Sequence, residues 1–278
     1  MRYKKIIIAS IFMLILAGGL TLFFNPYSCS RRITNAIINP NITKEDFRKI
    51  VIKNHIGINS SEFASKIWMI FDGTNFRPLH VACSEGDIEK VEILLEYGAD
   101  PNLLDETVKS TPLLFALLSG KPDRFDIAML LLKSGANTNY IDSRNENALF
   151  CSLIIVNSDN NIQIEKSLVL FKQLLKISKI DLKNAGSDTL LGEAAAFNNK
   201  PCLEYILKNN INGINDVSKS GQTPLMSCVM VSDNVELCNY LIQHGADKAL
   251  KNDEGKTAYD IAKEYGNEKC AKLCAMEQ

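Results

Sequence analysis

The stretch from residue 223 to residue 247, TPLMSCVMVSDNVELCNYLIQHGAD, decides the fold. Thr223 before Pro224 places a capping hydroxyl ahead of a helix whose first position tolerates a missing N–H. Four apolar residues then recur at spacings that make one face of a second helix: Val235, Cys238, Leu241 and Ile242. Gly245 supplies the left-handed residue that ends a helix. The stretch therefore predicts two short helices, the second of which ends at Gly245.

Similar openings recur along the rest of the chain. They lie near residues 77, 111, 147, 189, 223 and 257, at spacings of 34, 36, 42, 34 and 34 residues. Three copies close on Gly-Ala-Asp or a variant of it: Gly98-Ala99-Asp100, Gly135-Ala136-Asn137 and Gly245-Ala246-Asp247. Because two short helices with one apolar face each cannot enclose a core, the copies must stack.

These residues resemble the ankyrin repeat, whose pattern is a turn, Thr-Pro-Leu-His-x-Ala-Ala, a second helix with Leu-Leu, and Gly-Ala-Asp. The resemblance covers roughly residues 72–278 in about six repeats, and 252–257 also matches the family's hairpin turn. It implies an all-α solenoid of helix-turn-helix units joined by β-hairpin-like loops, in which His80 bonds backbone between units. The third unit differs from the family pattern in having extra polar residues at 157–161. The fourth unit has Asn-Asn-Ile-Asn at 209–212 where the pattern has Gly-Ala-Asp.

The N-terminal residues differ in character from the repeats. Residues 1–5 are basic, and residues 6–24 contain no charge. At about 1.5 Å per residue this run is about 28 Å long, close to the roughly 30 Å of a hydrocarbon core. It predicts an N-terminal hydrophobic helix that is either a transmembrane anchor or a signal peptide cleaved near Gly19. The flanking basic residues favour an extracytoplasmic repeat domain, held by a single-pass anchor or secreted or periplasmic after cleavage.

Two further segments precede the repeats. Residues 25–42 are expected to form a tether. Residues 43–71 are expected to form a helical N-terminal cap, with one helix from Thr43 and another from Ser61, that covers the open end of the first repeat.

Composition and motifs argue against catalysis and nucleic-acid binding. The net charge is −1, which is not the electrostatic footprint of a nucleic-acid-binding protein. The sequence contains no Gly-rich phosphate loop, no Gly-x-Ser-x-Gly turn and no His-Glu-x-x-His helix. We expect no enzyme activity, cofactor, metal or small-molecule substrate.

The eight cysteines allow three interpretations. Several, such as Cys228 and Cys238, occupy positions where the repeat pattern has small apolar residues, which favours core packing. Disulfide or redox use is the second interpretation. A metal site is the third, because Cys270 and Cys274 share a helix face, although no matching pair of ligands occurs elsewhere.

The resemblance implies that function is protein binding on the concave face, which comprises the ends of the first helices and the hairpin tips. Carried over by position, the helix ends are Ser84, Glu85, Leu118, Ser119, Ile154, Ile155, Ala196, Phe197, Met230 and Val231. The hairpin tips add Leu103, Leu104, Tyr140, Arg144 and Lys219. An exposed apolar stripe over these positions would mark a partner site. Alternatively, Ile154 and Ile155 are tucked inside and Phe197 packs under a loop.

The sequence thus predicts a non-catalytic protein-interaction module, membrane-tethered through residues 6–24 or exported, that binds an unknown protein partner on its concave face. Two alternatives stay open. One is an envelope scaffold that acts by self-association, and the other is a cysteine-based redox-responsive protein.

Overall fold

The computed structural model describes residues 36–37, 39, 41–53, 78–105, 108–154, 161–179, 189–231 and 233–275. The predicted basic segment 1–5, the hydrophobic segment 6–24 and the second cap helix from Ser61 lie outside the described residues. Within the described ranges, no helix is long and apolar enough to cross a membrane.

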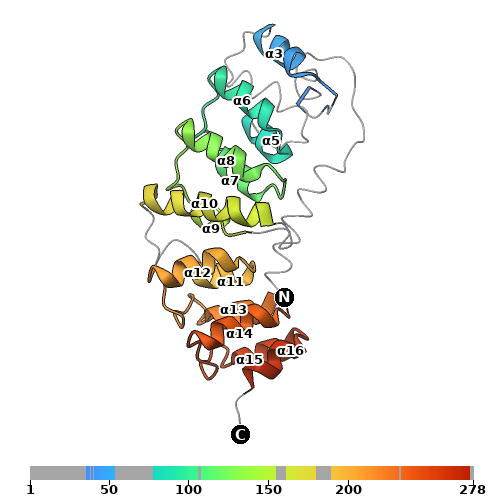
Figure 1. Cartoon of the computed structure of the whole chain (residues 1–278). Helices are drawn as coiled ribbons and strands as arrows, with labels where there is room; N and C mark the ends of the chain where they lie inside the picture. The colour runs from blue at the N-terminus through green and yellow to red at the C-terminus, as the bar shows by residue number, and fades with distance from the viewer. Residues whose placement is uncertain are drawn as a thin grey trace.

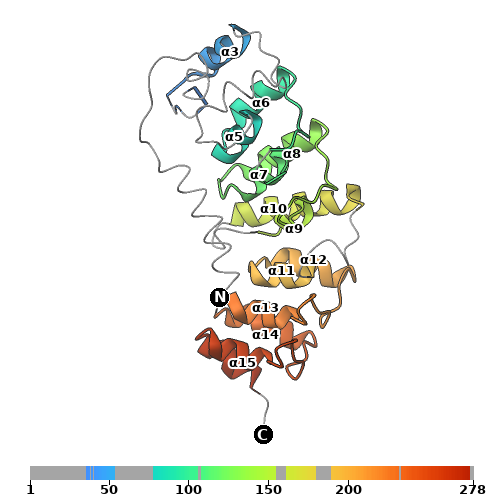
Figure 2. The ribbon, with the colours of Figure 1, turned by 180° about the vertical axis from the view of Figure 1, so that it is seen from behind.

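Six helix pairs follow one another in a single elongated stack (Figure 1). The first helices of the pairs are α5 (Pro78–Glu85), α7 (Pro112–Leu118), α9 (Ala148–Cys151), α11 (Leu190–Ala196), α13 (Pro224–Val231) and α15 (Ala258–Glu264). The second helices are α6 (Ile88–Glu96), α8 (Arg124–Lys133), α10 (Asn161–Ile177), α12 (Lys200–Lys208), α14 (Val235–Gln243) and α16 (Glu268–Cys274). The fold is all-α, as expected, and Figure 2 shows the same layered order from behind.

Side-chain caps explain where the first helices begin. The hydroxyl of Thr111 accepts from the backbone N–H of Leu114 at 3.4 Å, and that of Thr189 accepts from Gly192 at 2.9 Å. Asn147 performs the same role before α9, where the Thr-Pro pair is missing, and accepts from Phe150 at 3.1 Å. These caps satisfy N–H groups that the first turn of a helix leaves without partners.

The ends of the second helices explain the Gly-Ala-Asp pattern. Gly98 at the end of α6 has a φ of +85°, which a glycine adopts without steric cost. Asn210 takes the same place after α12 with a φ of +51°. The next residue, Ile211, donates its backbone N–H to the carbonyl of Ile206 at 3.1 Å. The fourth unit therefore ends its second helix as the others do, with asparagine in place of glycine.

Packing between units is uneven along the stack. The first helices contact one another more extensively than the second helices do where α5 meets α7, where α11 meets α13 and where α13 meets α15. The third pair differs because α9 has 4 residues whereas α10 has 17. There the joint to the fourth unit runs mainly through α10 and α12.

An N-terminal helix covers the open end of the stack. Helix α3 (Lys44–Lys53) packs on α6, with Phe47 fully buried between them. Two ion pairs flank this contact, Lys44 with Glu92 at 3.3 Å and Arg48 with Glu96 at 2.7 Å. Ile37, inside the predicted tether, is also buried and accepts a 2.8 Å hydrogen bond from the ammonium of Lys90 through its carbonyl. This burial keeps the apolar edge of the first repeat away from water.

Candidate partner-binding face

Two of the described hairpin loops are each organised by one acceptor side chain. The carboxylate of Asp105 is buried and accepts the backbone N–H groups of Val108 at 2.8 Å and Ser110 at 2.6 Å. Asn252 is buried in the equivalent turn of the last unit and accepts from Glu254 at 3.0 Å and Lys256 at 2.9 Å. Each turn is therefore held by its own side chain rather than by strand pairing. In the described residues the β pairing is a single bridge from Ile141 to Asn147.

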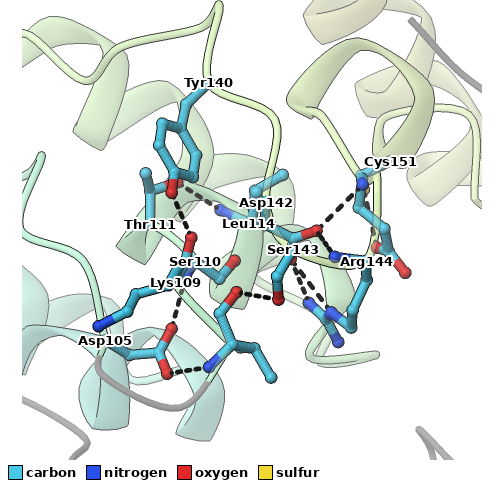
Figure 3. Close-up of polar contacts among 12 residues, drawn as sticks. Asp105, Lys109, Ser110, Thr111, Leu114, Tyr140, Asp142, Ser143, Arg144 and Cys151 are labelled. Atoms are coloured by element: carbon cyan, nitrogen blue, oxygen red, sulfur yellow. Dashed lines mark hydrogen bonds and ion pairs between the residues drawn. The ribbon is translucent and has the colours of Figure 1, made fainter.

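Neighbouring hairpins are bonded to one another. The backbone N–H and the hydroxyl of Ser143 both donate to the carbonyl of Val108, at 3.3 Å and 2.6 Å. The phenol of Tyr140 donates to the carbonyl of Lys109 at 2.6 Å (Figure 3). In the later units the N–H of Asp253 reaches the carbonyl of Ser220 at 3.2 Å. The described hairpins are thus joined in two places, at Val108 with Ser143 and at Ser220 with Asp253.

Arg144 lies in the third hairpin and is engaged within it. Its guanidinium pairs with the buried carboxylate of Asp142 at 2.8 Å, as Figure 3 shows. Glu146 lies beside this pair and accepts a hydrogen bond from the thiol of Cys151, with 3.4 Å between sulfur and oxygen. Burial raises the pKa of the Glu146 carboxyl, and the charge of Arg144 partly opposes that effect. Burial also raises the pKa of the Cys151 thiol, so this cysteine is not an activated nucleophile.

The polar candidates at the helix ends have local partners. Glu85 is exposed at the end of α5, with a carboxylate oxygen 3.8 Å from the ammonium of Lys121. The hydroxyl of Ser119 donates to the carbonyl of Ala116 at 2.8 Å and accepts the N–H of Lys121 at 3.2 Å. Ser84 is half-buried. These residues close the turn between helices as well as facing solvent.

The apolar candidates divide into two groups. Leu118, Ile154 and Met230 are half-buried and pack against the core. Val231 is 42% exposed at the end of α13, and Phe197 is half-buried at the end of α11. Ile155 lies outside the described residues, so the predicted stripe cannot be followed through the third unit.

The structure brings some candidates together and separates others. Helices α11 and α13 pack closely, so Phe197 and Val231 lie at the same ends of adjacent helices. The hairpin residues Tyr140 and Arg144 instead precede the first helices, whereas Leu118 follows one. A seven-residue helix such as α7 spans about 10 Å, so the two sets lie at opposite ends of the first helices. Of the remaining hairpin candidates, Leu103 and Leu104 are half-buried and Lys219 is exposed.

Two polar residues that bridge units were not predicted from the sequence. Arg124 is buried, and its guanidinium donates to the carbonyl of Leu117 at 3.4 Å and to that of Ile154 in the next unit. Burial lowers the pKa of Arg124 to about 10. Asn199 is fully buried and donates its amide to the carbonyl of Leu153 at 3.1 Å. Both bonds join residues 30 or more positions apart, and local periodicity carries no signal of such pairs.

The structure also shows how the histidine and cysteines are used. His80 is buried, with Nε2 3.2 Å from the carbonyl of Ser110, which agrees with the expected bond between units. Seven cysteines in the described part of the chain are reduced and buried. No three His, Cys, Asp or Glu side chains among the described residues are grouped so that they could hold a metal ion.

Comparisons with known proteins agree with this architecture. The family model of ankyrin repeats in three copies matches residues 79–164, 162–252 and 214–277. The ankyrin repeat protein YahD of Escherichia coli is 26% identical over 199 residues, which cover 69% of this chain and 92% of that protein. Human ankyrin repeat and SOCS box protein 6 is 28% identical over 63% of this chain. The chain spans only 36% of that human protein, and 28% of the Danio rerio protein ZDHHC13, which is named as a palmitoyltransferase.

Two solved structures extend the comparison. The ankyrin repeat domain of human ASB11 has a TM-score of 0.61 at 18% identity and covers 91% of this chain and 100% of its own. A structure of the predatory endopeptidase Bd0816 of Bdellovibrio bacteriovorus in complex with immunity protein Bd3460 contains a chain that matches at 31% identity. That match has a TM-score of 0.54 and covers 72% of this chain and 97% of the other. Ankyrin repeats are protein-interaction modules, and this chain belongs to the ankyrin-repeat family.

Proposed function

We propose that this protein is a non-catalytic interaction module whose partner protein binds across the ends of the first helices. The observation that carries the proposal is Val231, an exposed apolar side chain at the end of α13, beside the half-buried Phe197 at the same end of the neighbouring helix α11. Val231 is 42% exposed although it ends a helix whose other apolar residues are mostly buried. Apolar side chains in such a position are typical of the buried centre of an interface.

A matched pair of substitutions tests this site. Val231→Lys places a charge among the proposed contacts, and Val169→Lys makes the same change at a 58% exposed valine on the second helix α10. Burial of an unpaired charge is costly, so Val231→Lys should weaken partner binding at least about tenfold while Val169→Lys leaves it unchanged. Both variants should melt within a few degrees of the parent, because both positions are exposed.

The readout is quantitative mass spectrometry of proteins captured from the source cells by the full-length chain and by each variant. A partner retained by Val169→Lys and lost by Val231→Lys supports the proposal. Equal loss with both variants, or loss that accompanies unfolding, contradicts it. If the retained partner is a second copy of this chain, the self-association scaffold is the better account.

We also propose that residues 6–24 place the repeats at or beyond a membrane, either as an uncleaved anchor or as a signal peptide. The support is the uncharged run after a basic start, which is long enough to span a hydrocarbon core. C-terminal fusions to two reporters, one active only outside and one fluorescent only inside, test this placement. A signal from the inside reporter alone would overturn an extracytoplasmic repeat domain, and the size of the fusion reports whether the segment is cleaved.

The match to the endopeptidase complex favours a peptidase as the partner class. The matched chain comes from a complex that contains an endopeptidase and an immunity protein, and this chain covers 97% of it at 31% identity. On this proposal the captured partner is a peptidase whose activity falls when the chain is added at equal concentration. Full peptidase activity with the chain bound would show that binding is not inhibitory.

A further inference from the structure

Three cysteines gather where the last two second helices meet. Cys238 lies on α14, and Cys270 and Cys274 lie one turn apart on α16; all three are buried. The sulfurs of Cys238 and Cys274 are 3.7 Å apart, which is direct contact between two thiols. Cys270 also interacts with Cys238, whereas Cys151 meets Glu146 and Cys202 meets Ser167.

The place of Cys238 and Cys274 in the stack determines how a reagent reaches their buried sulfurs. Helix α16 packs mainly against α15 and α14. Short helices held by few neighbours are among the elements that open locally while the rest of a protein stays folded. Local opening of the seven-residue helix α16 therefore exposes the sulfurs of Cys238 and Cys274, whereas exposure of Cys202 requires the 17-residue helix α10 to separate from α12.

The surroundings also favour ionisation of one member of the pair. The hydrogen bond with Cys238 lowers the pKa of Cys274, burial partly opposes this effect, and the nearby charge of Lys248 adds to the lowering. Lys248 is fixed there because its ammonium donates to the carbonyl of Ala275 at 3.3 Å. The thiolate is the nucleophile in thiol–disulfide exchange, so Cys274 is suited to react first.

We propose that Cys238 and Cys274 form a disulfide that fastens the last unit to the fifth when the chain meets a disulfide oxidant. The Cys274 thiolate attacks one sulfur of the oxidant, for example oxidised glutathione, and expels one glutathione thiolate. Cys238 then loses its proton to solvent, and its thiolate attacks the Cys274 sulfur and expels the second glutathione. The chain loses two electrons, which the oxidant gains.

The expected consequence is resistance of the last unit to opening. The disulfide closes a loop between residues 36 positions apart and joins α14 to α16 directly. A closed loop of this length restricts the open state much more than the packed one. The proposed disulfide is independent of the proposed partner site, because both sulfurs lie on second helices whereas the partner site lies at the ends of first helices.

The test uses the full-length chain, purified reduced and equilibrated with mixtures of reduced and oxidised glutathione. After alkylation of free thiols, peptide mapping should find a Cys238–Cys274 link before any other cysteine pairs. Proteolytic cleavage within residues 233–275 should slow by at least about tenfold on oxidation. Cys238→Ser and Cys274→Ser should each remove both effects, while Cys202→Ser, a buried cysteine elsewhere, should retain them.

Three outcomes would overturn the inference. One is a link from Cys238 to Cys270 in place of Cys274, which Cys270→Ser would abolish. A second is the absence of any intramolecular disulfide at saturating oxidised glutathione, and a third is a link that forms only after denaturation. Circular dichroism of the reduced serine variants checks that they fold; if either does not, mapping of the parent chain decides the matter.

Discussion

Replacement of Asn199 by alanine should weaken the joint between the third and fourth units. Asn199 is fully buried, and its amide donates to the carbonyl of Leu153 at 3.1 Å and to the hydroxyl of Ser167 at 2.9 Å. Its carbonyl oxygen accepts the N–H of Cys202 at 3.3 Å and so caps α12. The first helices α9 and α11 contribute little at this joint, so these bonds and the contact of α10 with α12 hold it.

The size of the effect follows from these three bonds. Loss of a side-chain cap costs about 1 kcal/mol. Each lost hydrogen bond to a group that stays buried costs about 1 kcal/mol or more. Asn199→Ala should therefore reduce the free energy of unfolding by about 3 kcal/mol. Asn209→Ala is the matched control, because Asn209 is exposed and bonds only within its own helix, and should cost less than about 0.5 kcal/mol.

Urea unfolding followed by circular dichroism measures this prediction. Because each unit of a solenoid is coupled only to its neighbours, a weakened joint should also split the transition into two steps, one for each half of the stack. A single transition for Asn199→Ala with a midpoint equal to that of Asn209→Ala would refute the reasoning.

Two further predictions concern the hairpins. Gly221→Ala should cost at least about 2 kcal/mol, because a Cβ on this residue with φ +72° would lie 2.8 Å from the backbone nitrogen of Asp253. Gly255→Ala, with φ +75° and open space around it, should cost about 1 kcal/mol in thermal unfolding, and equal costs would show that the close approach is unimportant. Burial raises the pKa of Glu146 in the folded state, so folding favours the protonated carboxyl. The contribution of this carboxyl to stability is therefore fully present below its ordinary pKa and is lost as the pH rises through the raised value. In urea titrations, Glu146→Gln should therefore be as stable as the parent in acid and more stable than the parent at neutral pH. The opposite pH dependence would show that attraction of the carboxylate to Arg144 outweighs the cost of its burial.

Much of the fold could be predicted because its signals are local. A threonine before a helix and a glycine after one act within a single turn, so the caps at Thr111 and Thr189 and the stop at Gly98 agree with the sequence pattern. Asparagine shares these properties, as Asn147 and Asn210 show, which explains why the third and fourth units keep the architecture without the motif.

The candidate site was less predictable because exposure depends on neighbours. Met230 and Val231 are adjacent in the sequence, yet Met230 packs against the core while Val231 is exposed. Tyr140 was expected at a hairpin tip, but the direction of its hydroxyl toward Lys109 depends on the preceding unit. The contact of Cys238 with Cys274 likewise depends on how α14 meets α16, whereas the sequence related only Cys270 to Cys274.

The proposed interface places a partner protein against the ends of the first helices. A photo-crosslinking amino acid at position 231 of the full-length chain, with the same amino acid at position 169 as control, tests it in the source cells. We expect a defined adduct with one other protein from position 231 and none from position 169. An adduct from position 169 without one from position 231 would contradict this expectation and move the binding surface to the second helices.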